Sequence, residues 1–278
     1  MRSFVLLNVF VVEGDRFSGN PLCVFSDARG LTDDDMQQLA RQFNLSETTF
    51  VLPSASADAR VRIFTPGFEM PFAGHPTLGT AHVVGAGSSC ALEMIAGRVE
   101  VVADGNTYTL RAAKPPATRP VDATRAELAA MVGLPAEAIV GEPLWVNTGV
   151  EQLVIPIATR AQVMSAKPVL SLIERHGFSE SRQEAMAYLV ARDGDPWTVR
   201  FFFTSNGAVL EDPATGSACA NLGGYLLATG ATLPIRATLT QGEAVHRISK
   251  LGLHVAEDRS IFVSGEVRQL GSGVVDLG

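Results

Sequence analysis

The segment Asn44–Phe50, which reads NLSETTF, places a single carboxylate between two apolar stretches. No opposite charge lies within three residues of Glu47 on either side. A carboxylate among apolar neighbours binds its proton more tightly than one in water, so it can both accept and donate a proton near neutral pH. We therefore predict that Glu47 is a general acid and base. The alternative interpretation is that Glu47 is a solvated residue at the end of a helix.

Two other titratable side chains lie beside predicted helix starts. His75 follows Ala73-Gly74, and an imidazole at a helix start favours its neutral form and can donate or accept a proton at pH 7. Asp212 belongs to the segment EDPATGS, where it could help in proton transfer or hold the substrate. Each residue has a structural alternative, because both types are common at helix caps. Both are kept as candidate catalytic residues.

The turns that open these two helices are candidate anion sites. Ala73 and Gly74 precede one helix, and Thr215-Gly216-Ser217 precede the other. The first N–H groups of a helix lack intrahelical partners and lie at its positive end, so they bind carboxylates without lysine or arginine. We predict that these residues bind an acidic substrate and that Ser217 adds a hydroxyl. No GxSxG segment surrounds Ser217, which argues against a serine hydrolase.

A repeated strand pattern suggests two similar halves. Val61-Arg62-Ile63-Phe64 and Val199-Arg200-Phe201-Phe202 lie nearly half the chain apart. Each is followed by a loop with an acidic residue, Glu69 or Glu211, and then by a helix of small residues. This pattern predicts two halves, each a sheet around one buried helix, whose helix starts face each other across a cleft. Chance similarity of two apolar strands is the alternative.

Capping residues and periodicity predict the elements that position these groups. Thr32 as a cap, three aspartates and apolar residues at i, i+3, i+4 and i+7 indicate a helix over residues 33–43, with a strand at 48–52 after Glu47. Pro76 is typical of a first helical residue, so a helix is expected from Pro76 to Val84. Lys114-Pro115-Pro116, with Pro120 nearby, is the predicted linker. Other expected elements are strands at 4–12, 21–25 and 59–65, a hairpin of 97–102 with 107–112, helices at 124–132 and 169–176, strands at 144–147, 152–157, 185–190 and 198–204, a helix ending at Gly230, and strands over 233–277.

Composition excludes several classes of function. The 278 residues carry a net charge of −7 without a basic run, which argues against a nucleic-acid partner and favours a small molecule. Three cysteines, Cys23, Cys90 and Cys219, show no CxxC spacing, and the histidines show no metal-ligand spacing, so neither a disulfide framework nor a metal site is indicated. The apolar run at 4–12 is interpreted as a strand and not as a signal peptide, and no stretch is long enough to span a membrane. A cytoplasmic protein is the expectation.

Five segments together resemble the phenazine-biosynthesis PhzF family, and they occur in the family's order and spacing over nearly the whole chain. The resemblance implies a diaminopimelate-epimerase-like α/β (α+β) fold of two pseudo-symmetric halves, each a mostly antiparallel sheet or barrel around a central helix, with the site between them. It implies domains at 1–116, completed by about 268–278, and at 117–267, and a homodimer. The segments are Gly19–Leu22, Asn44–Phe50, Ile63–Pro66, Pro71–Thr80 and Glu211–Ala218.

The resemblance also implies an activity. The best-known family member isomerises trans-2,3-dihydro-3-hydroxyanthranilate without cofactor or metal, and it uses the glutamate of the NLSETTF motif, which corresponds to Glu47. Family members also place His75, Asp212 and Ser217 of the matching motifs in the cavity. Many relatives carry Gly-Arg-Pro-Ser after a Gln-Gly, whereas this chain continues from Gln241-Gly242 as EAVHRIS. The expected function is therefore a cofactor-independent isomerase of a small, cyclic carboxylic acid.

Two other functions stay open at this stage. The first is an epimerase or racemase of an amino or hydroxy acid, with His75 or Asp212 as partner of Glu47. Related epimerases use two cysteines at the helix starts, and this chain has none there, because Cys219 lies within the second helix. The second is a ligand-binding or scaffold protein that has kept the fold and lost turnover.

Overall fold

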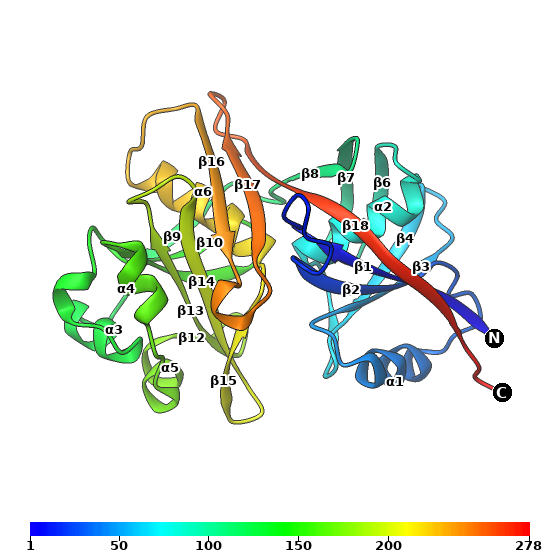
Figure 1. Cartoon of the computed structure of the whole chain (residues 1–278), viewed down its shortest axis with the longest axis horizontal. Helices are drawn as coiled ribbons and strands as arrows, with labels where there is room; N and C mark the ends of the chain where they lie inside the picture. The colour runs from blue at the N-terminus through cyan, green and yellow to red at the C-terminus, as the bar shows by residue number, and fades with distance from the viewer. The chain divides into compact units, whose positions relative to one another are not determined.

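The computed structural model describes residues 1–278, which form two compact units. The first comprises Met1–Arg111 and Ser264–Gly278, and the second comprises Ala112–Val263 (Figure 1). The predicted boundaries were 116/117 and about 267/268. The division falls a few residues earlier because β8 (Thr107–Arg111) ends at Arg111, while β18 (Ile261–Val275) begins in the second unit and continues into the first.

The first unit is a closed barrel around one helix. Strand β18 pairs with both β8 and β1, so the chain of pairings returns to its starting strand. Helix α2 (Gly74–Gly85) contacts seven of the barrel strands, and its residues from Gly74 to Ala81 are all buried. The barrel order is β1 (Arg2–Val9), β2 (Asn20–Phe25), β3 (Thr48–Leu52), β4 (Ala59–Phe64), β6 (Cys90–Met94), β7 (Gly97–Asp104), β8 and β18, and the short β5 (Glu69–Met70) is added to β4.

The second unit repeats this pairing scheme. Its pairs β11–β13 and β14–β16 are parallel, as are β2–β3 and β4–β6 in the first unit, and its pairs β13–β14 and β16–β17 are antiparallel, as are β3–β4 and β6–β7. Helix α6 (Gly216–Ala228) takes the place of α2. The strands are β9 (Ala117–Pro120), β10 (Leu144–Asn147), β11 (Glu151–Ile157), β12 (Phe178–Ser179), β13 (Glu184–Ala191), β14 (Trp197–Ser205), β15 (Ala208–Asp212), β16 (Ile235–Gln241) and β17 (Ser249–Val255). The predicted fold of two similar halves is confirmed.

The repeat extends to an ion pair in each unit. Arg62 on β4 contacts Glu69 on β5 at 2.6 Å, and Arg200 on β14 contacts Glu211 on β15 at 2.7 Å. The Arg62 guanidinium lies 5.0 Å from the centroid of the Phe64 ring, and the Arg200 guanidinium lies 4.6 Å from that of Phe202. In both units the phenylalanine is two residues further along the same strand. The acidic residues noted after the repeated strands are therefore equivalent in structure.

Small residues let both central helices fit inside their strands. A Cβ atom at Gly79 of α2 would lie 2.5 Å from Leu22 Cδ2, and one at Gly224 of α6 would lie 2.8 Å from Pro116 Cβ. The predicted start of α2 at Pro76 was wrong by two residues, because the helix begins at Gly74. Proline is tolerated there, since the first four N–H groups of a helix have no intrahelical acceptor.

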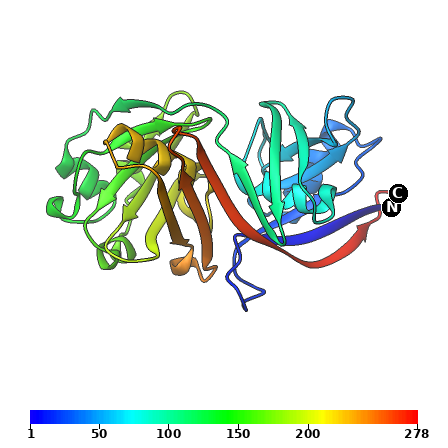
Figure 2. The same ribbon diagram turned by 90° about the horizontal axis from the view of Figure 1, so that it is seen from above.

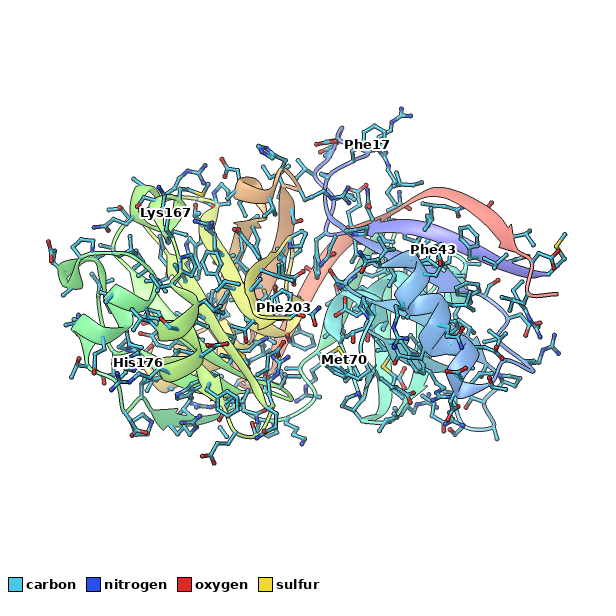
Figure 3. All side chains as sticks on the ribbon, turned by 90° about the horizontal axis from the view of Figure 1, so that it is seen from below. Phe17, Phe43, Met70, Lys167, His176 and Phe203 are labelled. Atoms are coloured by element: carbon cyan, nitrogen blue, oxygen red, sulfur yellow. The ribbon has the colours of Figure 1, made fainter.

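Helix α1 (Asp33–Phe43) has the predicted bounds and carries the chain to Glu47. Thr32 and Asp35 form a capping box, and the helix buries Met36, Leu39 and Ala40 against a cluster of aromatic residues from the strands. Its last residue, Phe43, which Figure 3 labels, packs edge-on against Phe4 of β1 with ring centroids 4.9 Å apart. The helix ends in a left-handed residue, Asn44, whose N–H donates to the carbonyl of Ala40.

The remaining elements differ from prediction in a few places. Residues 117–120, which follow the predicted linker Lys114-Pro115-Pro116, form β9 and pair with β10. Neither β9 nor α4 (Arg160–Ser165) was predicted. The predicted helices at 124–132 and 169–176 are α3 (Arg125–Met131) and α5 (Leu170–His176), and two short 3-10 helices are η1 (Ala136–Ala138) and η2 (Glu243–Val245).

The apolar N-terminal segment is strand β1, as predicted, although it ends at Val9. The next residue, Phe10, adopts a φ of 66° and interrupts the extended backbone. Figure 2 shows the two chain ends side by side, where Arg2 pairs with Val275. None of the helices is long and apolar enough to cross a lipid bilayer.

Candidate active site

Glu47 and His75 form a close pair in the first unit. Glu47 lies between α1 and β3, and His75 is the second residue of α2. His75 Nδ1 is 3.3 Å from Glu47 Oε2, and the side chains are 4% and 15% exposed. The other ring nitrogen, Nε2, is 3.3 Å from the carbonyl oxygen of Pro21 on β2. Because a carbonyl only accepts, Nε2 carries the hydrogen in this contact. In a neutral ring Nδ1 then has no hydrogen, so a hydrogen bond between Nδ1 and Glu47 requires one more proton, which the two groups share.

Burial sets the protonation of the imidazole. Loss of solvent lowers the pKa of His75 to about 4, and the contact with the Pro21 carbonyl raises it by a smaller amount. The neutral ring is therefore favoured near pH 7. The alternative role of His75 as a helix cap is not observed, because the N-cap residue of α2 is Ala73 and no side chain caps this end.

The lowered pKa of His75 predicts a pH dependence of stability. The unfolded chain binds a proton at this residue below about pH 6.5, whereas the folded chain does so only below about pH 4. Stability is therefore lost as the pH falls through this window, by about 2 kcal/mol between pH 7 and pH 5. Urea unfolding at the two pH values measures this loss. The His75→Asn variant should lack this part of the loss, and the control His176→Asn, on α5, should keep it. Equal losses of stability in the wild type and in His75→Asn would contradict a neutral His75 in the folded protein.

Asp212 and Thr215 form the corresponding group in the second unit. Asp212 is the last residue of β15, and Thr215 is the N-cap residue of α6. The Thr215 hydroxyl donates to Asp212 Oδ2 at 2.6 Å. Thr215, and not Asp212, occupies the cap position, and its side chain makes no capping hydrogen bond. The hydroxyl instead orients the carboxylate of Asp212.

Gln241 fixes the turn between Asp212 and α6. Its Oε1 accepts from the Thr215 backbone N–H at 3.2 Å, and its Nε2 donates to the Asp212 carbonyl and to Thr215 Oγ1, both at 2.9 Å. The next residue, Gly242, has a φ of 76°, and a Cβ atom there would lie 2.3 Å from the carbonyl oxygen of Arg247. Gln241, which holds the candidate site, thus lies just before the segment that departs from the family pattern.

Ser217 joins a buried polar network. Its hydroxyl accepts a hydrogen bond from Gln152 Nε2 at 2.9 Å, and Gln152 Oε1 accepts from Asn221 Nδ2 at 2.8 Å. Asn221 Oδ1 in turn accepts from the backbone N–H and the hydroxyl of Thr148. The sequence alone did not predict a role for Gln152, Asn221 or Gln241. The available signal was a single amide side chain in each of three elements, because a buried amide needs partners.

The structure brings the predicted residues together in two groups, one in each unit. Glu47, Ala73, Gly74 and His75 lie around the start of α2. Asp212, Thr215, Gly216 and Ser217 lie around the start of α6. Their action on one substrate stays a prediction.

The cysteines contribute to neither group. Cys219 is fully buried within α6, and its Sγ contacts the carbonyl of Gly252 at 3.9 Å. Burial raises its pKa far above the ordinary range of a thiol. Cys23 and Cys90 are also buried, with pKa values raised to about 12 and about 11. A pair of reactive thiols at the helix starts is therefore absent.

The two units also differ at the position of Glu47. In the first unit Phe50 faces Arg62, and in the second unit Leu189 faces the equivalent Arg200. Glu47 lies three residues before Phe50, and Met186 lies three residues before Leu189. Met186 is therefore the residue of the second unit that is equivalent to Glu47. The carboxylate at this position therefore occurs in one unit alone.

Comparison with known proteins places the chain among isomerases. The family model described as "Phenazine biosynthesis-like protein" matches residues 9–273. An uncharacterized isomerase of Pasteurella multocida is 38% identical over 98% of this chain and 93% of the relative. The trans-2,3-dihydro-3-hydroxyanthranilate isomerase of Pseudomonas aeruginosa is 35% identical over 81% of this chain and 80% of the relative. These names confirm the predicted enzyme class, an isomerase.

A solved structure supports the fold. The PhzF-family phenazine biosynthesis protein of Bacillus anthracis covers 99% of both chains with a TM-score of 0.87 at 23% sequence identity. At this identity the comparison bears on the fold alone. On the family model and the relatives together, the chain belongs to the phenazine biosynthesis-like PhzC-PhzF family.

Proposed function

We propose that this protein is a cofactor-independent isomerase that moves a proton between carbon atoms of a small, cyclic carboxylic acid. The observation that carries the proposal is the contact of Glu47 Oε2 with His75 Nδ1, within 3.3 Å and largely shielded from water. One carboxyl and one neutral imidazole that share a proton form an acid and base suited to neutral pH. The named activity of the Pseudomonas relative supports this class of reaction.

The proposed reaction has two steps. The carboxylate of Glu47 removes a proton from a carbon that a neighbouring π-system and carboxylate make acidic, so a C–H bond breaks and an O–H bond forms on Glu47. The electron pair delocalises into the π-system and the carboxylate. Glu47 then returns the proton to a different carbon, which restores the free carboxylate. The N–H groups at the starts of α2 and α6 hold the substrate anion while charge develops, and Asp212 holds another polar group of the substrate.

The difference between the units favours one base over two. An epimerase that inverts a carbon needs a proton donor and an acceptor on opposite faces of the substrate. The position equivalent to Glu47 holds Met186, whose thioether cannot exchange a proton. Asp212 and His75 are the alternative second groups, so epimerisation is the second candidate that the experiment must separate.

Deuterium labelling tests the proposal. The probe is trans-2,3-dihydro-3-hydroxyanthranilate, the substrate named for the Pseudomonas relative, incubated with the protein in D₂O. We expect the double bonds to be shifted, as read by NMR, with deuterium at the carbon that gains the proton in those turnovers in which the Glu47 O–H exchanges with D₂O before the second step. Deuterium at the original carbon with inverted configuration would instead indicate an epimerase. Binding without any turnover of this probe would contradict the isomerase and favour a ligand-binding protein.

We further propose a homodimer, which the family resemblance implies, and a cytoplasmic location, which the composition predicts. Light scattering of the purified protein measures the first, and fractionation of cells measures the second.

A further inference from the structure

The hydrogen bonds that lead to Ser217 run in one direction, which backbone atoms fix. Asn221 Oδ1 accepts from the backbone N–H of Thr148 at 2.9 Å, and this group can only donate. Asn221 Nδ2 donates to the carbonyl oxygen of Val150 at 2.8 Å, and this group can only accept. The amide of Asn221 therefore has one possible orientation. The side chain is fully buried, so water cannot replace either contact.

The orientation of Asn221 determines that of Gln152. Because Asn221 Nδ2 also donates to Gln152, the atom of Gln152 that faces it must be the oxygen, and the nitrogen faces Ser217. Ser217 Oγ must then accept, and its own O–H proton points away from Gln152. Gln152 is 1% exposed, so this arrangement is held within the second unit. Ser217 thus presents a hydrogen-bond donor next to the free N–H groups at the start of α6.

The first unit has the opposite arrangement at the equivalent place. His75 is the second residue of α2, as Ser217 is of α6. His75 donates from Nε2 to the Pro21 carbonyl on β2, so the atom left to interact, Nδ1, is a basic nitrogen beside Glu47. Ser217 accepts from Gln152 on β11, so the group left to interact is a donor. One helix start therefore presents a proton acceptor, and the other presents a proton donor.

We propose that Gln152 is a positioning residue that holds the Ser217 hydroxyl as a hydrogen-bond donor to the anionic group of the substrate. This role rests on the proposed function, because it requires an acidic substrate. Gln152 acts only through Ser217, and Asn221 sets the orientation of Gln152. The substrate class that this site recognises is a carboxylate, which accepts from the serine O–H and the helix N–H groups together.

A double-mutant cycle tests the role. The variants are Gln152→Met, which keeps the length of the side chain and removes its donor, Ser217→Ala, and the combination of both. Turnover of trans-2,3-dihydro-3-hydroxyanthranilate and calorimetric binding of its aromatic analogue 3-hydroxyanthranilate are the readouts. We expect Ser217→Ala to lower kcat/KM about 30-fold and Gln152→Met about tenfold, mainly through KM. In the Ser217→Ala background, Gln152→Met should change kcat/KM by less than about twofold.

The control and the second variant separate orientation from stability. Thr198→Val removes a hydrogen bond of another buried side chain of the second unit, whose hydroxyl accepts from Arg160, and should leave KM unchanged. Gln152→Glu still accepts from Asn221, but its other carboxylate oxygen accepts where the amide nitrogen donated. The Ser217 hydroxyl then donates to this carboxylate instead of to the substrate, so binding should weaken more than in Gln152→Met. An equal loss from Gln152→Met in both backgrounds would overturn the positioning role and indicate a structural one.

The outcomes also distinguish this role from the proposed function. If the wild type binds 3-hydroxyanthranilate without turning over the dihydro acid, the isomerase proposal fails. Coupling between Gln152→Met and Ser217→Ala in the measured binding affinities would still support the positioning role of Gln152. If the wild type is active and Gln152→Met matches Thr198→Val, the positioning role fails while the isomerase stands. A wild type that binds neither compound overturns both.

Discussion

Replacement of Glu47 by glutamine should lower kcat about a thousandfold while changing the affinity for 3-hydroxyanthranilate by less than about threefold. Glutamine has nearly the shape of protonated glutamate, and its amide can donate to His75 Nδ1 across the same 3.3 Å contact. It cannot take up and release a proton at this position. The loss should therefore fall on the chemical step and not on binding. Steady-state kinetics and calorimetry on the same preparation measure the two effects separately.

The matched control is Glu100→Gln in the same unit. Glu100 lies on β7 and pairs with Arg98 at the surface, so the substitution makes the same chemical change away from α2. It should leave both kcat and binding unchanged. If Glu47→Gln keeps more than a tenth of the wild-type kcat, the assignment of Glu47 as general acid and base is wrong.

Replacement of Glu211 by alanine should lower the free energy of unfolding by about 3 kcal/mol. Arg200 and Glu211 are 9% and 7% exposed, so their pairing compensates two charges removed from water. Arg200 also donates to the carbonyls of Val163, Met164 and Ala166, which hold its guanidinium in place when Glu211 is absent. The variant therefore leaves a buried, unpaired positive charge. Urea unfolding followed by circular dichroism measures the loss.

The repeat provides the comparison for this prediction. Glu69→Ala removes the equivalent carboxylate in the first unit, where Arg62 and Glu69 are 14% and 23% exposed. Arg62 also contacts Asp33, so it keeps a negative partner in this variant. The loss of stability should be about 1 kcal/mol. Equal losses in the two variants would contradict the argument from burial.

Elements with local signals were predicted well from sequence. Helix α1 carries its N-cap, its acidic first turn and its apolar face within a dozen residues, so its bounds were correct. The hairpin β7–β8 encloses an Asp-Gly-Asn turn that is readable in the same way. The position of Glu47 between helix and strand followed from these neighbours, and the candidate residues were identified from short motifs.

Features set by distant partners could not be predicted. Gln152 bonds to Ser217 and Asn221, residues of another element more than 60 positions away in the chain. Only the register of β11 against α6 reveals that its amide faces a serine. The start of α2 at Gly74 is likewise a result of packing, because the whole first turn is buried inside the barrel and held by its strands. The helix signal at Pro76 describes local preference alone.

The path of β18 bears on the order in which the chain acquires structure during translation. The last segment, Ser264–Gly278, belongs to the first unit, and its strand pairs with both β1 and β8. The barrel that carries Glu47 and His75 therefore stays open at one seam until Ser264–Gly278 has been synthesised, whereas Ala112–Val263 is complete earlier. A ribosome stalled before Ser264 would expose a chain in which the barrel around Glu47 and His75 has not yet closed.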